Sequence, residues 1–373
     1  MDAFANSSAI LKDENMERKA KYMKSGCILG LLLIAFTING CRSENQSYST
    51  DYSVAVMQTM EYKEKTDFML FDDQLRQVGE YRTSYPNVAY DGFCNSTVYG
   101  GKLYINPMGH ADERDYGRVV EIDLKDGTAK EYSFDRINIV DIAYKDNRLY
   151  AVSNLNGVCY LDVMDCETGE ISTIETDTQF ITTITPGDSD AYGIGVEFET
   201  DMLGIYEIDF EEKTVRKLYE CDPDHKLDYL VYSDGNLYFV LDGLLTEYEV
   251  KTDRITTYQL PHSNAYNLLL QDEELYIGCT DIFSNAQSFV DRFDLKTKEI
   301  TGLLETDGAI LQMEVSQAQD RLYLLGRDQL VQYALENDTA AEKNRVTLTP
   351  EGDYYIGGFF LNEKNLEEKE NEK

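Results

Sequence analysis

The 373-residue sequence has no tryptophan, only six prolines and only three histidines. It also lacks C-x-x-C, H-E-x-x-H and glycine-rich phosphate-loop motifs, so the common signals for zinc, redox and nucleotide chemistry are absent. Basic residues are scarce, because 34 Lys and Arg stand against 69 Asp and Glu, giving a net charge of −35. A surface of this sign repels phosphate backbones and anionic lipid headgroups, so we expect no nucleic-acid binding.

No apolar run is long enough for a good transmembrane helix, which needs about 20 residues. The longest run is GCILGLLLIAFTI (26–38), and it follows a basic stretch that contains Arg18 and Lys24. A short apolar run behind basic residues is typical of a secretory signal. Residues 1–15 do not fit ahead of such a signal, so we expect translation to start at Met16 or Met23.

The signal ends in INGC (38–41), which resembles the lipobox of bacterial lipoproteins. Ile38, Gly40 and Cys41 match that pattern, and Asn39 is a less usual residue in it. The resemblance implies cleavage before Cys41 and a thioether-linked diacylglycerol on its sulfur. It also implies a place in the bacterial cell envelope, on the outer side of the cytoplasmic membrane or the periplasmic side. The alternative is an ordinary signal peptide with an incidental cysteine.

The sequence thus predicts four segments. Residues 1–41 are the signal peptide, and 42–52 form a polar tether to the lipid, which is the only membrane contact we expect. Residues 53–361 form the folded domain, expected to be monomeric, and 362–373 form a disordered charged tail. The remaining cysteines are predicted to be free buried thiols, with a Cys159–Cys166 bridge as the alternative: Cys94, Cys159, Cys166, Cys221 and Cys279.

The domain repeats one phrase, a polar turn followed by Leu-Tyr (Ala-Tyr at 191–192) and an apolar strand, as in SDGNLYFV (233–240). The tyrosines of the repeat recur at a spacing near 44 residues: Tyr104, Tyr150, Tyr192, Tyr238, Tyr276 and Tyr323. An apolar strand precedes each phrase, and a hairpin of alternating apolar and polar residues follows it, as in IYEIDFEEKTVRKLY (205–219). This pattern predicts blades of four antiparallel strands, A (inner), B (with the tyrosine), C and D (outer).

A seventh blade is predicted from the two ends of the domain. Residues 68–83 read as a C–D hairpin without inner partners, and 352–362 read as an A strand without a hairpin. Residues 53–60 supply a candidate B strand, so the ends together complete one blade and close the ring. We therefore predict an all-β, seven-bladed β-propeller. A six-bladed ring is the alternative if the first hairpin packs elsewhere.

This pattern resembles the β-propeller superfamily, and in particular the uncharacterised propeller lipoproteins of bacteria. The resemblance spans nearly the whole mature chain but rests on periodicity, since no WD dipeptide and no recurring kelch Gly-Gly pair is present. The repeat tyrosines are expected to pack between neighbouring blades, with each hydroxyl bonded to a backbone group.

Function is expected on the face where the B–C and D–A loops emerge, because the long irregular segments and all three histidines fall there. A second candidate is a ring of polar residues nine or ten positions before each repeat tyrosine: Asn95, Asp141, Thr183, Asp228, Asn267 and Glu314. We expect this ring to line the central channel. The candidate ligand-binding residues are His110, Asp112, Asp115, Asp141, His225, Asp228, His262, Asn267 and Glu314.

Three functions fit these features. The first is a binding module that holds a protein, peptide or glycan on the loop face, with loop-tip aromatics as its expected mark: Tyr116, Phe198, Tyr266 and Phe283. The second is a metal-dependent lactonase- or hydrolase-like enzyme with a divalent cation such as Ca²⁺ in the channel. His110 or His225 with nearby carboxylates would serve it. The third is a structural subunit of an envelope assembly. The sequence favours the first, and no catalytic residue is assigned.

Overall fold

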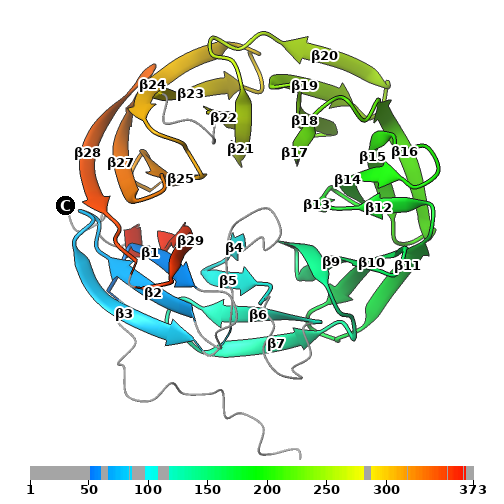
Figure 1. Ribbon diagram of the computed structural model, residues 1–373, viewed down its shortest axis with the longest axis horizontal. Coiled ribbons are helices and arrows are strands. Elements are labelled where there is room, and N and C mark those ends of the chain that lie inside the picture. The colour runs from blue at the N-terminus through cyan, green and yellow to red at the C-terminus, as the bar shows by residue number, and fades with distance from the viewer. Residues whose placement is uncertain are drawn as a thin grey trace, which may run out of the picture. The chain divides into compact units, whose positions relative to one another are not determined.

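The computed structural model describes residues 51–59, 66–83, 85, 97–107, 117–280, 287–316, 318–350, 352–363 and 365–366. Within these ranges the chain forms seven antiparallel sheets arranged as a ring around a central axis (Figure 1). Each sheet is one propeller blade, and the predicted seven-bladed architecture is confirmed. No helix in the described ranges is long and apolar enough to cross a membrane.

Six blades are continuous in sequence, and their strands run in chain order from the centre of the ring outward. Blade I contains β4 (Thr97–Tyr99), β5 (Lys102–Ile105), β6 (Arg118–Asp123) and β7 (Ala129–Ser133). Blade II contains β8 (Ile139–Lys145), β9 (Arg148–Leu155), β10 (Val158–Asp165) and β11 (Ile171–Thr176). Blade III contains β12 (Gln179–Ile181), β13 (Thr185–Pro186), β14 (Ala191–Glu197), β15 (Leu203–Asp209) and β16 (Thr214–Cys221).

The other three continuous blades follow the same plan. Blade IV contains β17 (Leu227–Ser233), β18 (Asn236–Leu241), β19 (Leu244–Glu249) and β20 (Arg254–Tyr258). Blade V contains β21 (Ala265–Gln271), β22 (Glu274–Cys279), β23 (Gln287–Asp294) and β24 (Ile300–Asp307). Blade VI contains β25 (Gln312–Ser316), β26 (Arg321–Leu325), β27 (Gln329–Glu336) and β28 (Thr339–Thr347).

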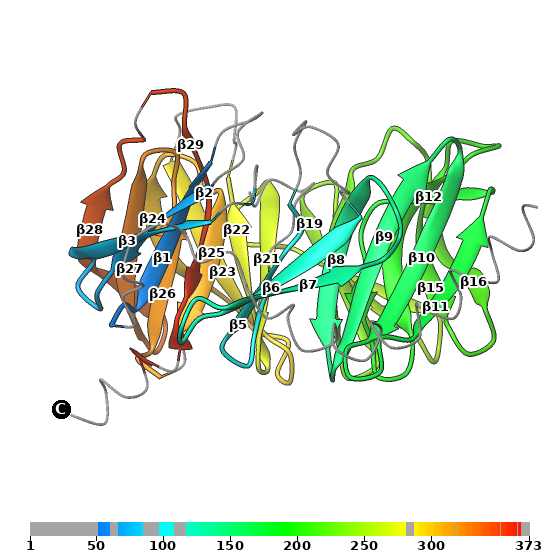
Figure 2. The same ribbon diagram turned by 90° about the horizontal axis from the view of Figure 1, so that it is seen from below.

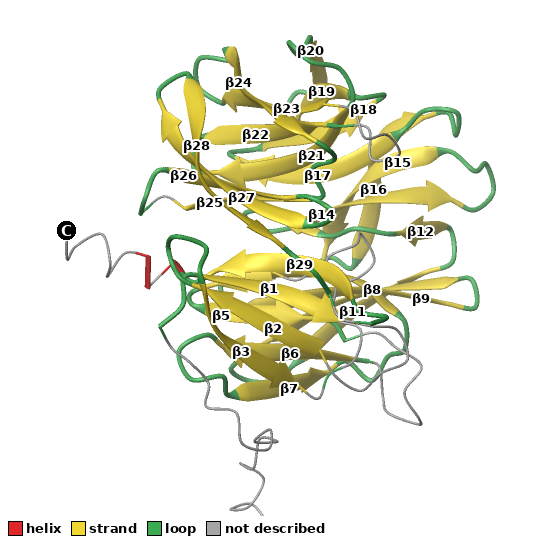
Figure 3. Cartoon of the chain, turned by 60° about the vertical axis from the view of Figure 1, so that its left-hand side comes forward, coloured by secondary structure: helices red, strands yellow, loops and turns green. Residues whose placement is uncertain are grey.

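Blade VII joins the two ends of the domain, as predicted. Its inner strand is β29 (Tyr355–Leu361), and β1 (Val54–Thr59), β2 (Thr66–Phe71) and β3 (Gln77–Thr83) follow outward (Figure 3). Strand β1 pairs antiparallel with β29, with Val54 opposite Leu361. The first hairpin therefore completes the ring, and the six-bladed alternative is wrong.

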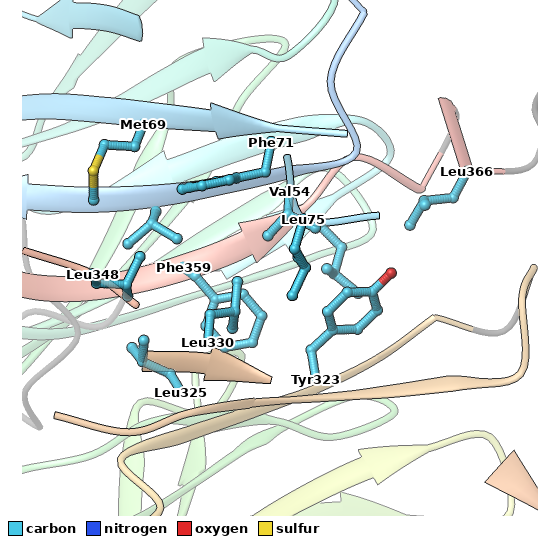
Figure 4. Close-up of a cluster of buried hydrophobic side chains, with 12 residues drawn as sticks. Val54, Met69, Phe71, Leu75, Tyr323, Leu325, Leu330, Leu348, Phe359 and Leu366 are labelled. Atoms are coloured by element: carbon cyan, nitrogen blue, oxygen red, sulfur yellow. The ribbon is translucent and has the colours of Figure 1, made fainter. Parts of the chain in front are cut away.

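A cluster of buried hydrophobic side chains fills the junction between blades VI and VII. Val54, Phe71 and Phe359 from blade VII pack against Tyr323 and Leu330 from blade VI (Figure 4). All five side chains are at most 2% exposed. Burial of this apolar area drives ring closure, and it leaves no exposed sheet edge at the junction.

The inner hairpins turn where the sequence places Asp-Asn and Asp-Gly. Asp146 and Asn147 have φ values of 48° and 63°, and Asp234 and Gly235 have φ values of 48° and 80°. Two consecutive residues with positive φ match the twist of a two-residue hairpin, and Asp, Asn and Gly tolerate that conformation best. This turn chemistry fixes the start of the repeat-tyrosine strands β9 and β18.

The repeat tyrosines pack between neighbouring blades. The rings of Tyr104 and Tyr144 stack with centroids 4.3 Å apart, and Tyr144 belongs to the inner strand of the next blade. The hydroxyls of Tyr238 and Tyr323, however, bond side chains instead of the predicted backbone groups. Tyr238 donates to Glu247 Oε1 at 3.0 Å, and Tyr323 accepts from Gln332 Nε2 at 2.7 Å. Polar partners on the adjacent outer strand satisfy these buried hydroxyls.

Two tyrosine-to-phenylalanine changes test the importance of these hydroxyl bonds. Tyr323→Phe removes the bond to buried Gln332 and should lower the free energy of unfolding by about 1 kcal/mol. Tyr206 is the matched control, because its hydroxyl is buried without a partner in the described part of the chain. Tyr206→Phe should leave stability unchanged or raise it in urea denaturation. Equal losses in the two variants would contradict this explanation.

Blade III is the least regular blade, because two short pieces, β12 and β13, fill its inner position. Between them, threonine side chains take over backbone bonding. Thr182 Oγ1 donates to the Ile194 carbonyl at 3.2 Å, and the Ile194 amide donates to Thr183 Oγ1 at 3.0 Å. Thr183, a predicted member of the polar ring, thus holds the interrupted strand in place.

Candidate functional site on the loop face

The loop face is the side of the ring where the inner strands begin and the B strands end, so it carries the D–A and B–C loops. Figure 2 shows the ring edge-on, with its two faces at the top and bottom of the view. His225 lies there between blades III and IV, and His262 lies there between blades IV and V. Several predicted site residues lie outside the described residues: Cys41, His110, Asp112, Asp115, Tyr116 and Phe283.

Two members of the predicted polar ring connect blades to each other. Asp141 is 3% exposed, and its Oδ2 accepts a bond of 2.6 Å from the Ile184 amide in blade III. Asn267 is 5% exposed, and its Nδ2 donates to the carbonyls of Ile310 and Leu311, both at 3.3 Å. These side chains lie between blades because an inner strand alternates its side chains toward its two neighbours.

The matching residue in blade VI is Gln312, which the sequence spacing does not single out. Gln312 lies opposite Leu325, two residues after the repeat tyrosine, whereas Glu314 lies opposite Tyr323 itself. The turn of this blade is longer, since Ser316 pairs with Arg321. Gln312 bonds both the amide and the carbonyl of Phe359, at 2.8 and 2.7 Å, and so fastens blade VI to the closing strand.

Glu314 lies beside the contact between Gln312 and Phe359. Its Oε1 accepts a bond of 3.0 Å from Gln312 Nε2. Burial raises the pKa of Glu314 to about 7, and the nearby Glu363 carboxylate adds to the rise. Glu363 accepts a bond of 3.0 Å from Ser316 Oγ in the same region. Glu314 therefore changes charge near neutral pH.

His262 connects its loop to β23 of blade V through an ion pair and a ring contact, which together we call the His262 clasp. Its Nδ1 lies 2.7 Å from Oδ1 of Asp291, a carboxylate that is fully buried. The imidazole stacks on Phe289 with centroids 3.9 Å apart and an interplanar angle of 5°. A carboxylate on Nδ1 fixes the orientation of the ring. His262 is thereby held as an ordered part of the loop face.

Blade II has the same clasp with an arginine in place of histidine. Arg136 Nε lies 3.2 Å from Asp162 Oδ2, and its guanidinium carbon lies 4.3 Å from the Tyr160 ring centre. Asp162 is 1% exposed and also accepts from Thr173 at 2.5 Å. Burial raises the pKa of Asp162, with Thr173 and Arg136 opposing the rise. The parallel indicates a structural role for the His262 clasp as well.

His225 makes a similar but exposed pair. Its Nδ1 lies 2.6 Å from Asp242 Oδ2, and the Lys226 amide donates to the other oxygen of Asp242 at 2.9 Å. The hydrogen bond and charge of Asp242 raise the pKa of His225. The pair joins the loop before blade IV to the turn at Asp242 within that blade. Exposed pairs contribute little to stability, so its effect is local ordering.

The described cysteines are free thiols, as predicted: Cys159, Cys166, Cys221 and Cys279. The alternative Cys159–Cys166 bridge is absent, and Cys94 lies outside the described residues. Burial raises the pKa of Cys159 to about 11. A thiol with a raised pKa is a poor nucleophile at neutral pH, so Cys159 fits a packing role in the core.

An exposed aromatic pair lies on the loop face of blade III. Phe180 and Phe198 are 36% and 39% exposed, with ring centroids 6.2 Å apart in an edge-to-face arrangement. The Phe198 amide donates to the Thr178 carbonyl at 2.9 Å, which brings the two segments together. Phe198 is among the aromatics predicted for a binding face. Phe180 is missed by the sequence reasoning because it lies in a strand of only three residues.

Acidic residues lie close in sequence to this aromatic pair. Asp177 lies three residues before Phe180, and Glu199 and Asp201 follow Phe198, all three exposed. Among the described residues, no group of three or more His, Cys, Asp and Glu side chains is placed to hold a metal ion. The described loop face therefore offers aromatic surface and carboxylates.

Comparison with known proteins shows the fold alone. Searches of protein-family models and of curated proteins find no match. Among solved structures, the chain is similar to a candidate 6-phosphogluconolactonase from Bacteroides uniformis, with a TM-score of 0.56 and 10% identity over 83% of this chain and 99% of that chain. It is also similar to AztD from Citrobacter koseri, with a TM-score of 0.52 and 8% identity over 83% and 97%.

A third similar structure is an oligogalacturonate lyase in complex with manganese, with a TM-score of 0.51 and 14% identity over 66% of this chain and 74% of that chain. At identities this low, the similarity establishes a propeller fold and carries no activity with it.

Proposed function

We propose that this protein is a lipid-anchored, extracytoplasmic β-propeller that binds a protein, peptide or glycan through its loop face. The observation that carries the proposal is the exposed pair Phe180 and Phe198. Aromatic side chains supply most of the energy in many recognition surfaces, because they bury a large area at low entropic cost. Lipid on Cys41 would anchor the propeller to the membrane through a polar tether.

The metal-dependent alternative, a lactonase- or hydrolase-like enzyme, draws less support. Its histidine-centred ligand set around His110 lies outside the described residues. Its other set includes His225, but among the described residues no group of three or more His, Cys, Asp and Glu side chains is placed to hold a metal ion. The 6-phosphogluconolactonase and lyase named above share the fold at 10% and 14% identity, which does not extend their activities to this chain.

A capture experiment tests the proposal. Residues 42–373, immobilised through the C-terminus, should retain a defined partner from a detergent extract of the cell envelope. The double variant Phe180→Ser and Phe198→Ser should lose at least 90% of that partner, because a buried aromatic anchor contributes about 2 kcal/mol or more to such an interface.

The control removes equally exposed apolar groups from the opposite face. Ile171 and Ile255 are 40% and 45% exposed, and each lies next to an outer-hairpin turn. Changing both to serine should leave capture unchanged. If this control loses the partner and the phenylalanine variant retains it, the binding surface is not the loop face.

A further inference from the structure

One inner-strand carboxylate differs from its counterparts in other blades. Asp141, Asn267 and Gln312 each lie opposite the second residue after a repeat tyrosine, are at most 5% exposed, and bond the next blade's backbone. Asp228 occupies the same register, opposite Val240. Yet Asp228 is exposed, and within the described residues it has no hydrogen bond or ion pair. Its carboxylate is therefore available to a ligand.

The direction of Asp228 follows from the packing of its neighbours. Leu227 and Leu230 both pack in the core between blades III and IV, whereas Tyr229 packs against the core between blades IV and V. Side chains alternate along a strand, so Asp228 points away from Leu227 and toward blade V. The register shift between Asp228 and Leu230 allows Tyr229 to lie on that same side.

Blade V brings a second ring to the same corner. Tyr266 is the residue at the register shift of β21, and its ring meets Tyr229 with centroids 5.5 Å apart and an interplanar angle of 66°. Tyr229 and Tyr266 are both partly exposed. The three residues lie near the start of the neighbouring inner strands β17 and β21, so they share one part of the loop face between blades IV and V (Figure 1).

The backbone at this corner is also unusual. Tyr229 has a φ of 49°, in the left-handed region that a bulky side chain rarely adopts. Residues held in such conformations concentrate at ligand clamps and active sites. The surrounding protein also raises the pKa of Asp228, and Lys226 offsets this only in part. Because partial desolvation destabilises the charged form of this carboxylate, a nearby cation would lower its free energy.

We propose that Asp228, Tyr229 and Tyr266 form a binding site, here called the seat, for an organic cation, an ammonium or guanidinium group, on the loop face between blades IV and V. The carboxylate would pair with the charge, and the two rings would offer their π faces to it. This inference rests on the proposed function, since it names the chemistry of one group in the ligand. The net charge of −35 would draw such ligands toward the protein.

Isothermal titration of residues 42–373 with a tetralysine peptide and with spermidine tests the seat. Asp228→Asn should weaken binding about tenfold, and Tyr266→Leu about threefold to tenfold. Asp224→Asn is the matched control, because Asp224 is exposed in the preceding loop and loses the same charge. That control should change the dissociation constant less than twofold. Binding of tetralysine but not spermidine would identify a peptide ligand, and the reverse a polyamine.

A stability measurement separates recognition from a structural role. Asp228→Asn should keep the melting temperature, because the carboxylate bonds nothing within the described chain.

Three results would overturn the seat. They are equal affinity in Asp228→Asn and Asp224→Asn, a lower melting temperature in Asp228→Asn, and displacement of tetralysine by one equivalent of Ca²⁺ or Mg²⁺. If neither cation binds but envelope capture still depends on Phe180 and Phe198, the seat fails and the proposed function stands. If capture also fails, both fail.

Discussion

Replacing Arg136 with methionine is expected to lower the free energy of unfolding by about 3–5 kcal/mol at pH 7. The guanidinium is the cation that pairs with Asp162, a carboxylate only 1% exposed, and it also packs over Tyr160. Methionine keeps much of the apolar stem but leaves the buried charge with Thr173 alone. Removing one partner of a buried ion pair is costly because the remaining charge stays desolvated.

The loss should shrink as the pH falls. Burial already raises the pKa of Asp162, and loss of Arg136 should raise it further, so protonation in the folded state replaces the missing cation. Asp162→Asn in the same background should recover most of the stability at pH 7. Urea denaturation at pH 4.5 and 7 measures both effects. An equal loss at the two pH values would show that packing on Tyr160, and not charge, is responsible.

Replacing Glu314 with glutamine should raise stability at pH 8 by about 2–3 kcal/mol and change it little at pH 4.5. The folded-state pKa of Glu314 is about 7, raised from 4.5 chiefly by burial. A raised carboxyl pKa means that the folded state holds a proton the unfolded state has lost. The stability of the wild type therefore falls as the pH rises from about 4.5 to 7, by about 1.4 kcal/mol for each step of one in pH.

The difference between wild type and Glu314→Gln isolates this one group. General repulsion among the 69 acidic residues also grows with pH, but it is common to both proteins. Glu363→Gln serves as a second variant, because it removes the neighbouring charge that adds to the rise in pKa. It should reduce the pH dependence without abolishing it. Parallel stability curves for wild type and Glu314→Gln from pH 4.5 to 8 would disprove the assignment.

The fold was predictable because strand period, turn residues and repeat length all point to the same architecture. Five Leu-Tyr phrases and the Ala-Tyr phrase at 191–192 mark six blades, and the unpaired segments at the two ends predict the seventh. The pairing of individual residues between neighbouring strands was harder to predict from the sequence. Spacing from the tyrosine singles out Glu314, whereas the longer turn of blade VI places Gln312 at the equivalent position.

The candidate site was predictable only in part, because residue type does not reveal the partner of a side chain. Asp141, Asn267 and Asp228 look alike in sequence, yet two connect blades and the third is exposed. The difference comes from where each inner strand shifts its register. In blade IV the shift is at Tyr229, after Asp228, whereas in blade V it is at Tyr266, before Asn267. A one-residue displacement of this kind leaves no mark in the amino-acid pattern.

The most direct test of the binding claim is amide hydrogen exchange with and without the captured envelope partner. We expect slower exchange on the loop face, at residues 177–180, 197–201 and 225–229. We expect no change at the turns of the opposite face, at residues 124–128, 165–170 and 209–213. Protection confined to those turns, with the loop face unchanged, would contradict the claim that this propeller binds its partner through the loop face.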